Sequence, residues 1–175
     1  MKRALIGYLL FGVLAASIQY GYWPLAAMST SVAAFVMVGR RATRASGYAV
    51  VRGHSHPGAK ANVRIHEGAH GAAARLVRGR VIGMVVTGDD RRASGYTDVV
   101  IPNDPASMIG VSLAGLEAAP STTSPSDLNA VDRVLATVPA PFRGEVLKEG
   151  RRIACKAARS SDVNYYVRKL EREDQ

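Results

Sequence analysis

The residues with the clearest chemical potential are His66, Glu67 and His70, which form the pattern H-E-x-x-H. On an α-helix, residues four apart lie on the same face, so the two imidazoles can bind one zinc ion. Glu67 lies about 100° around the helix from His66, where it can take a proton from a zinc-bound water. The spacing therefore indicates peptide hydrolysis by a zinc-activated water.

The same pattern also has an ordinary structural interpretation. Five-residue patterns occur by chance, and an Ala-rich helix can carry His and Glu on its solvated face. Gly68 costs about 1 kcal/mol relative to Ala inside a helix, so it does not favour a plain structural helix. Both interpretations stay open at the level of the pattern alone.

Several further elements must position this motif. A helix is predicted from about Lys60 to Val77, with Gly79 as its left-handed cap. Turn residues and hydrophobic periodicity predict two strands, near 80–86 and 94–101. They also predict four more helices, near 105–119, 125–138, 145–158 and 162–173. Asp104 and Ser124 are the expected N-caps of the first two of these helices, each followed by a proline.

A hydrolytic zinc needs a third protein ligand, an Asp or Glu brought close by the fold. Spacing alone does not select it. Asp127 occupies the third position of the helix that follows Ser124, where a carboxylate can complete a capping box. Capping and metal binding are not exclusive, since each carboxylate has several lone pairs.

Four segments appear in the same order as in a known family: His66–His70, Ser94–Thr97, Leu113–Ala119 and Thr122–Leu128. From about Arg64 to Leu135 the sequence resembles the peptidase domain of the FtsH-type membrane zinc metalloproteases.

The resemblance implies that His66, His70 and Asp127 bind Zn²⁺ and that Glu67 is the catalytic base. It also implies that Gly95, Tyr96 and Thr97 lie at a strand edge that holds an extended substrate. An ordinary half-buried strand aromatic is an equally good interpretation of Tyr96.

The sequence departs from the family pattern at three points. Gly and Ala are exchanged inside the zinc motif, and Pro120 stands where an acidic residue follows the Ala-Ala pair. A Walker loop is missing, and the span from Arg40 to Ile65 is too short for the family's ATPase module. ATP-driven unfolding is therefore not implied.

The first forty residues are expected in a membrane. No charged residue occurs between Ala4 and Val38, and the middle of this stretch, 19–24, gathers three aromatics, a Gly and a Pro. We predict a transmembrane helical hairpin at 1–41, with the rest of the chain in the cytosol because basic residues flank both ends. A cleaved signal peptide is the alternative.

Residues 42–59 are rich in Gly, Ser, Pro and Arg and are predicted to be a linker. The stretch from Gly53 to Lys60 superficially resembles a phosphate-binding loop, but no Lys-Ser/Thr pair follows Gly58. His54 and His56 are expected to be solvated.

The chain of 175 residues carries a formal net charge of +9. Basic residues do not alternate with aromatics as in a nucleic-acid platform, so no nucleic acid is expected as a partner. Cys155 is the single cysteine and cannot form an internal disulfide.

The sequence thus predicts a mainly helical α+β fold, in which a zincin-like metallopeptidase domain with a small β hairpin or sheet, at 60–175, follows the transmembrane hairpin. The expected activity is a membrane-anchored zinc endopeptidase in the bacterial cytoplasmic membrane. Its expected partners are polypeptide substrates, membrane lipid, and a separate ATPase or further copies of the chain. A catalytically inactive, peptidase-like adaptor is one alternative, and a basic domain that binds anionic lipid is another.

Overall fold

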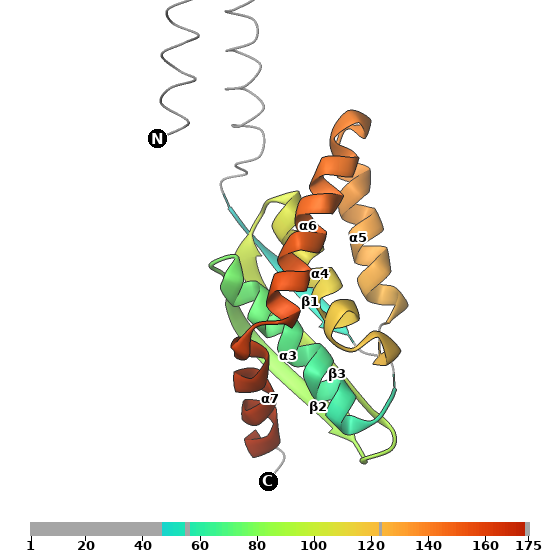
Figure 1. Cartoon of the computed structure of the whole chain (residues 1–175), viewed down its shortest axis with the longest axis vertical. Coiled ribbons are helices and arrows are strands. Elements are labelled where there is room, and N and C mark those ends of the chain that lie inside the picture. Colours follow the sequence, from blue (N-terminus) through green and yellow to red (C-terminus); the bar gives the residue numbers. More distant parts are fainter. Residues whose placement is uncertain (1–46, 55–56, 123, 174–175) are drawn as a thin grey trace, which may run out of the picture. The chain divides into compact units, whose positions relative to one another are not determined.

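The computed structural model describes residues 47–54, 57–122 and 124–173. Within these ranges the fold is mainly helical with one small sheet, which confirms the predicted α+β class (Figure 1). The elements in chain order are β1 (Tyr48–His54), α3 (Lys60–Leu76), β2 (Arg80–Gly88), β3 (Ala93–Pro102), α4 (Pro105–Ala118), η1 (Pro120–Thr122), α5 (Pro125–Thr137), η2 (Ala140–Phe142), α6 (Arg143–Ala158) and α7 (Ser161–Glu173).

The transmembrane hairpin expected at 1–41 lies outside the described residues. Among the residues that are described, no helix combines the length and the apolar character that a membrane crossing requires.

The sheet has the order β1-β3-β2, and both pairs are antiparallel. β3 is therefore the central strand, with Val99 opposite Val51 of β1 on one side and Val81 of β2 on the other. A register shift between Val81 and Gly83 marks a bulge in β2. The linker expected at 42–59 is wrong in part, because its residues Tyr48–His54 form β1 and complete this sheet.

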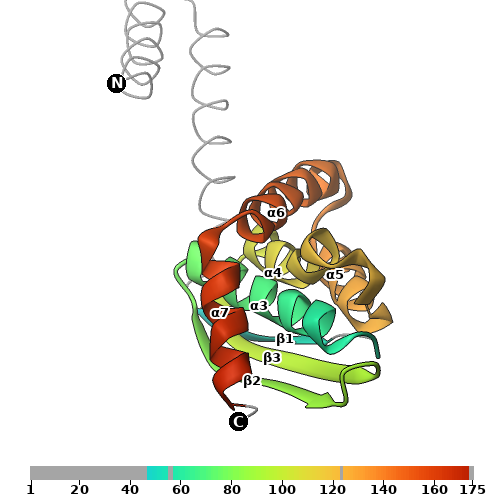
Figure 2. The same ribbon diagram turned by 60° about the horizontal axis from the view of Figure 1, so that its bottom comes forward.

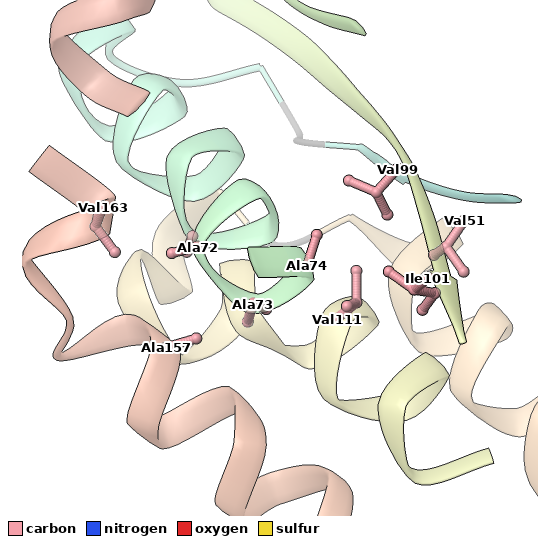
Figure 3. Packing of buried hydrophobic residues seen from close by; sticks show 11 residues of the cluster. Val51, Ala72, Ala73, Ala74, Val99, Ile101, Val111, Ala157 and Val163 are labelled. Atoms are coloured by element: carbon pink, nitrogen blue, oxygen red, sulfur yellow. The ribbon is translucent and has the colours of Figure 1, made fainter. Parts of the chain in front are cut away.

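α3 lies across one face of the sheet, and α4 and α6 lie beyond it (Figure 2). Its contact surface is built from small residues: Ala72, Ala73 and Ala74 are buried among branched side chains such as Val99 and Ile101 (Figure 3). Short side chains let the helix backbone approach both the strands and the next helix closely. α3, which carries the H-E-x-x-H pattern, is thus packed against the sheet on one side and against α4 on the other.

The connections that position the site begin and end as the sequence predicts. The Asp104 carboxylate accepts a hydrogen bond from the backbone N–H of Ser107 at 2.9 Å. The Ser124 hydroxyl accepts one from the N–H of Ser126 at 3.1 Å. Because both side chains cap orphan N–H groups, α4 and α5 start at defined residues.

The end of α3 differs from the prediction in detail. Arg78 takes the left-handed backbone conformation, with φ 63°, and Gly79 does not. Gly79 is needed there for a different reason, since a Cβ at that position would lie 2.6 Å from the Ile101 side chain. The glycine allows close packing of the turn against β3.

Candidate metal centre

The three residues of the H-E-x-x-H pattern lie on the side of α3 that faces the protein interior. The relative exposure of His66, Glu67 and His70 is 0% for each. An ordinary solvated helix face would leave these polar groups in water. The interpretation of the motif as a wet face is therefore wrong.

Asp127 joins the two histidines from the first turn of α5, 61 positions beyond His66 in the chain. Its Oδ2 lies 3.1 Å from His66 Nε2 and 3.7 Å from His70 Nε2. The two Nε2 atoms are 3.1 Å apart. The fold thus brings together the three metal ligands that the resemblance implies.

These separations fit a tetrahedral ion. Ligand atoms at 2.0–2.1 Å from zinc and at tetrahedral angles lie about 3.3–3.4 Å from one another. The three observed separations, 3.1, 3.1 and 3.7 Å, have that size. The donor set of His66, His70 and Asp127 could therefore hold a metal ion without rearrangement of the backbone.

The far side of each imidazole fixes which nitrogen faces the metal position. His70 Nδ1 lies 2.7 Å from the Val111 carbonyl oxygen, which can only accept, so this nitrogen carries the proton. His66 Nδ1 lies 3.1 Å from the Thr122 hydroxyl. That hydroxyl donates its own hydrogen to the Ala119 carbonyl at 2.9 Å and so accepts from His66.

In neutral rings, both Nε2 lone pairs consequently point to the same place as the Asp127 carboxylate. Three lone pairs at such distances repel each other unless a cation lies between them. Hydrogen bonds from the second ring nitrogen of metal-binding histidines to carbonyls or other acceptors are the usual device that fixes this tautomer.

A proton can take the place of the metal in part. Burial acts most strongly on His70 and lowers its pKa, but the hydrogen bond and charge of Asp127, together with the charge of Glu67, outweigh it. The pKa of His70 is thereby raised from 6.5 to about 9 in the metal-free protein. If the carboxyl groups of Asp127 and Glu67 are both ionised, the buried cluster still has a net negative charge after it binds one proton. A divalent cation would neutralise it.

The three residues predicted to bind substrate are not equivalent in the structure. They lie on the central strand β3 and not at an edge, so the edge prediction is wrong. Thr97 is buried beneath α3, while Tyr96 points to the other face of the sheet, with the Arg52 guanidinium 5.3 Å from its ring centre. A Cβ on Gly95 would lie 2.9 Å from Glu67 Cγ.

Sequence reasoning misses two glycines that make room for the imidazoles. A Cβ on Gly53 of β1 would lie 2.5 Å from His70 Nε2, and one on Gly115 of α4 would lie 2.6 Å from His66 Cδ2. Each ring therefore fills the space above a glycine. The resemblance offered one signal, since Gly115 lies in the matched helix Leu113–Ala119, whereas Gly53 lies in the predicted linker.

The chain was compared with models of protein families, with curated proteins and with solved structures, and none of the three comparisons finds a match.

Proposed function

We propose that the chain is a zinc-dependent endopeptidase related to the FtsH-type proteases. The observation that carries the proposal is the convergence of His66, His70 and Asp127 on one buried position. Glu67 directly follows His66 on α3 and is also buried. Two imidazoles and a carboxylate are a common ligand set of hydrolytic zinc, with the fourth position left for water.

In this proposal His66, His70 and Asp127 would hold the zinc, which would supply Lewis acidity to a carbonyl and to a water. Glu67 would be the general base that accepts a proton from the attacking water, and the acid that donates it to the leaving amine. The Val111 carbonyl and the Thr122 hydroxyl keep the two imidazoles in the tautomer that presents Nε2.

The proposed substrate is an extended polypeptide. β1 is the edge strand next to the metal ligands, since Gly53 lies directly under the His70 ring. A peptide that pairs with the outer edge of β1 would gain main-chain hydrogen bonds with little regard for its side chains. The membrane anchor, the cytosolic orientation and a partner ATPase belong to the same proposal and rest on the sequence.

The test combines metal analysis with an assay of proteolysis on the full chain. We expect one zinc per chain and cleavage of casein or of an unfolded peptide library. Glu67→Gln should keep the zinc and lose cleavage by at least about a hundredfold, whereas Glu145→Gln, at an exposed position of α6, should change neither. Absence of stoichiometric zinc, or cleavage that is unaffected by Glu67→Gln, would refute the proposal.

One observation favours a second candidate, a binding module with a purely structural metal. The three ligands are each at most 1% exposed, as in closed structural sites. This candidate predicts bound zinc, stability that depends on zinc, and no cleavage in either the wild type or Glu67→Gln. The same experiment therefore separates the two functions.

A further inference from the structure

Glu67, the general base of the proposed reaction, is hydrogen-bonded to a residue of the central strand β3. Thr97 Oγ1 donates a hydrogen bond to Glu67 Oε2 at 2.7 Å, and the same oxygen lies 3.2 Å from the Glu67 backbone carbonyl. Both residues are fully buried. A short hydrogen bond from a hydroxyl to a carboxylate is among the stronger ones that a side chain makes.

Gly95 acts on the same side chain through its missing Cβ. It lies two residues before Thr97 on β3 and therefore faces α3 as Thr97 does. Its backbone is fixed opposite Val86 in the β2–β3 ladder. Because a Cβ there would lie 2.9 Å from Glu67 Cγ and 2.7 Å from the Val85 carbonyl, only a glycine leaves the side chain of Glu67 its present place.

We infer that Thr97 and Gly95 are positioning residues for Glu67 and take no part in substrate binding. A glutamate has three rotatable side-chain bonds, so its carboxylate needs an anchor to remain at one place beside the metal ligands. Thr97 supplies that anchor, and Gly95 supplies the space for the aliphatic part of the side chain. The inference rests on the proposed function, because it assigns Glu67 a role that only hydrolysis requires.

This arrangement makes a prediction that differs from substrate binding. A residue that holds substrate affects KM, whereas a residue that orients the base affects the chemical step. Misplacement of a catalytic group by about 1 Å can cost about a hundredfold in rate. Loss of the Thr97 hydroxyl should therefore lower kcat and leave KM and the zinc content unchanged.

The experiment uses the full-length protein with Thr97→Val, Thr97→Ser and, as a matched control on the neighbouring strand, Thr87→Val at an exposed position. Each variant is assayed for zinc content and for kcat and KM on one peptide substrate. We expect Thr97→Val to lower kcat about ten- to a hundredfold. Thr97→Ser, which retains the hydroxyl, should recover most of that loss, and Thr87→Val should behave as the wild type.

A second measurement is independent of activity. In a thermal double-mutant cycle, Thr97→Val should lower the melting temperature clearly in the wild type and much less in a Glu67→Ala background, where the acceptor is gone. Equal effects in both backgrounds would overturn the inference, because the hydroxyl would then not act through Glu67.

The outcomes distinguish this inference from the function beneath it. Zinc-loaded wild type without Glu67-dependent cleavage would refute the proposed function and the positioning role together. Cleavage by the wild type that Thr97→Val leaves intact, or reduces only through KM, would refute the positioning role and leave the peptidase standing.

Discussion

The buried cluster predicts that pH and zinc act on the stability of this protein in opposite directions. In the metal-free protein the pKa of His70 is raised from 6.5 to about 9. A raised pKa means that the protonated ring stabilises the fold. This contribution is fully present below pH 6.5 and is lost as the pH rises through 9.

The size of the effect follows from the shift. Each pKa unit corresponds to about 1.4 kcal/mol, so a rise from 6.5 to about 9 amounts to about 3 kcal/mol of unfolding free energy. The metal requires the neutral ring and must displace the proton. About one ring in a hundred is neutral at pH 7 and about half are neutral at pH 9, so zinc should bind about fiftyfold more weakly at pH 7 than at pH 9.

The assay is urea unfolding at pH 6.5 and 9, with chelator-treated protein and with zinc held at a fixed free concentration by a metal buffer. We expect the metal-free protein to lose about 3 kcal/mol between the two pH values, and zinc to stabilise more at pH 9 than at pH 6.5. Asp127→Asn should remove most of the pH dependence, because the hydrogen bond and charge of Asp127 are the largest effects that raise the pKa of His70. Asp132→Asn, on the exposed side of the same helix, is the matched control.

A metal-free protein whose stability does not change between pH 6.5 and 9 would refute this reasoning. So would an equal stabilisation by zinc at both pH values. Either result would mean that His70 does not hold a proton at the position assigned to the metal.

Three further predictions concern the packing around the site. Gly53→Ala and Gly115→Ala should each lower zinc affinity strongly in isothermal titration, because the new methyl group displaces an imidazole. Gly144→Ala, which faces open space, should leave the affinity unchanged. Unchanged affinity in the first two variants would contradict the packing of the imidazoles against these glycines. Thr122→Val removes the hydrogen-bond partner of one histidine and should weaken zinc binding about 10–100-fold in a chelator competition; wild-type affinity would contradict that role. Gly110→Ala should destabilise the chain by about 1–3 kcal/mol in urea unfolding, since the new Cβ would lie 2.6 Å from the Ile153 side chain of α6. An unchanged unfolding midpoint would contradict the close packing of α4 on α6.

The local part of this structure could be predicted from the sequence because its signals are local. Asp104 and Ser124, each followed by proline, mark the starts of α4 and α5, and the structure shows both capping bonds. The H-E-x-x-H spacing places two imidazoles on one helix face whatever surrounds them. Only the resemblance identifies Asp127 as a metal ligand, since its position in the chain also fits a helix cap.

The sheet could not be predicted in the same way. β1 lies in a segment whose Gly, Ser and Pro residues favour a linker, although the alternation of exposed Tyr48 and Val50 with buried Val51 is typical of a strand. Without β1, β3 looks like the edge of a hairpin. Once β1 pairs with it, β3 is the central strand, and Thr97 lies buried under α3.

The tertiary contacts of the site explain why its neighbours are small. Two imidazoles and two carboxyl groups on adjacent elements need space that an ordinary core would fill with side chains. That space comes from Gly53 and Gly115 beside the rings and from Gly95 beside the Glu67 side chain. Each of these glycines is far from the motif in sequence, so a search for polar residues alone does not find them.

The same contacts connect folding with chemistry. Burial of two carboxyl groups beside two imidazoles is unfavourable unless a cation balances their charge. The fold surrounds this cluster with an Ala-rich core and orients both Nε2 atoms toward the Asp127 carboxylate. A divalent cation bound at that position would balance the charge, so metal binding and folding should be coupled.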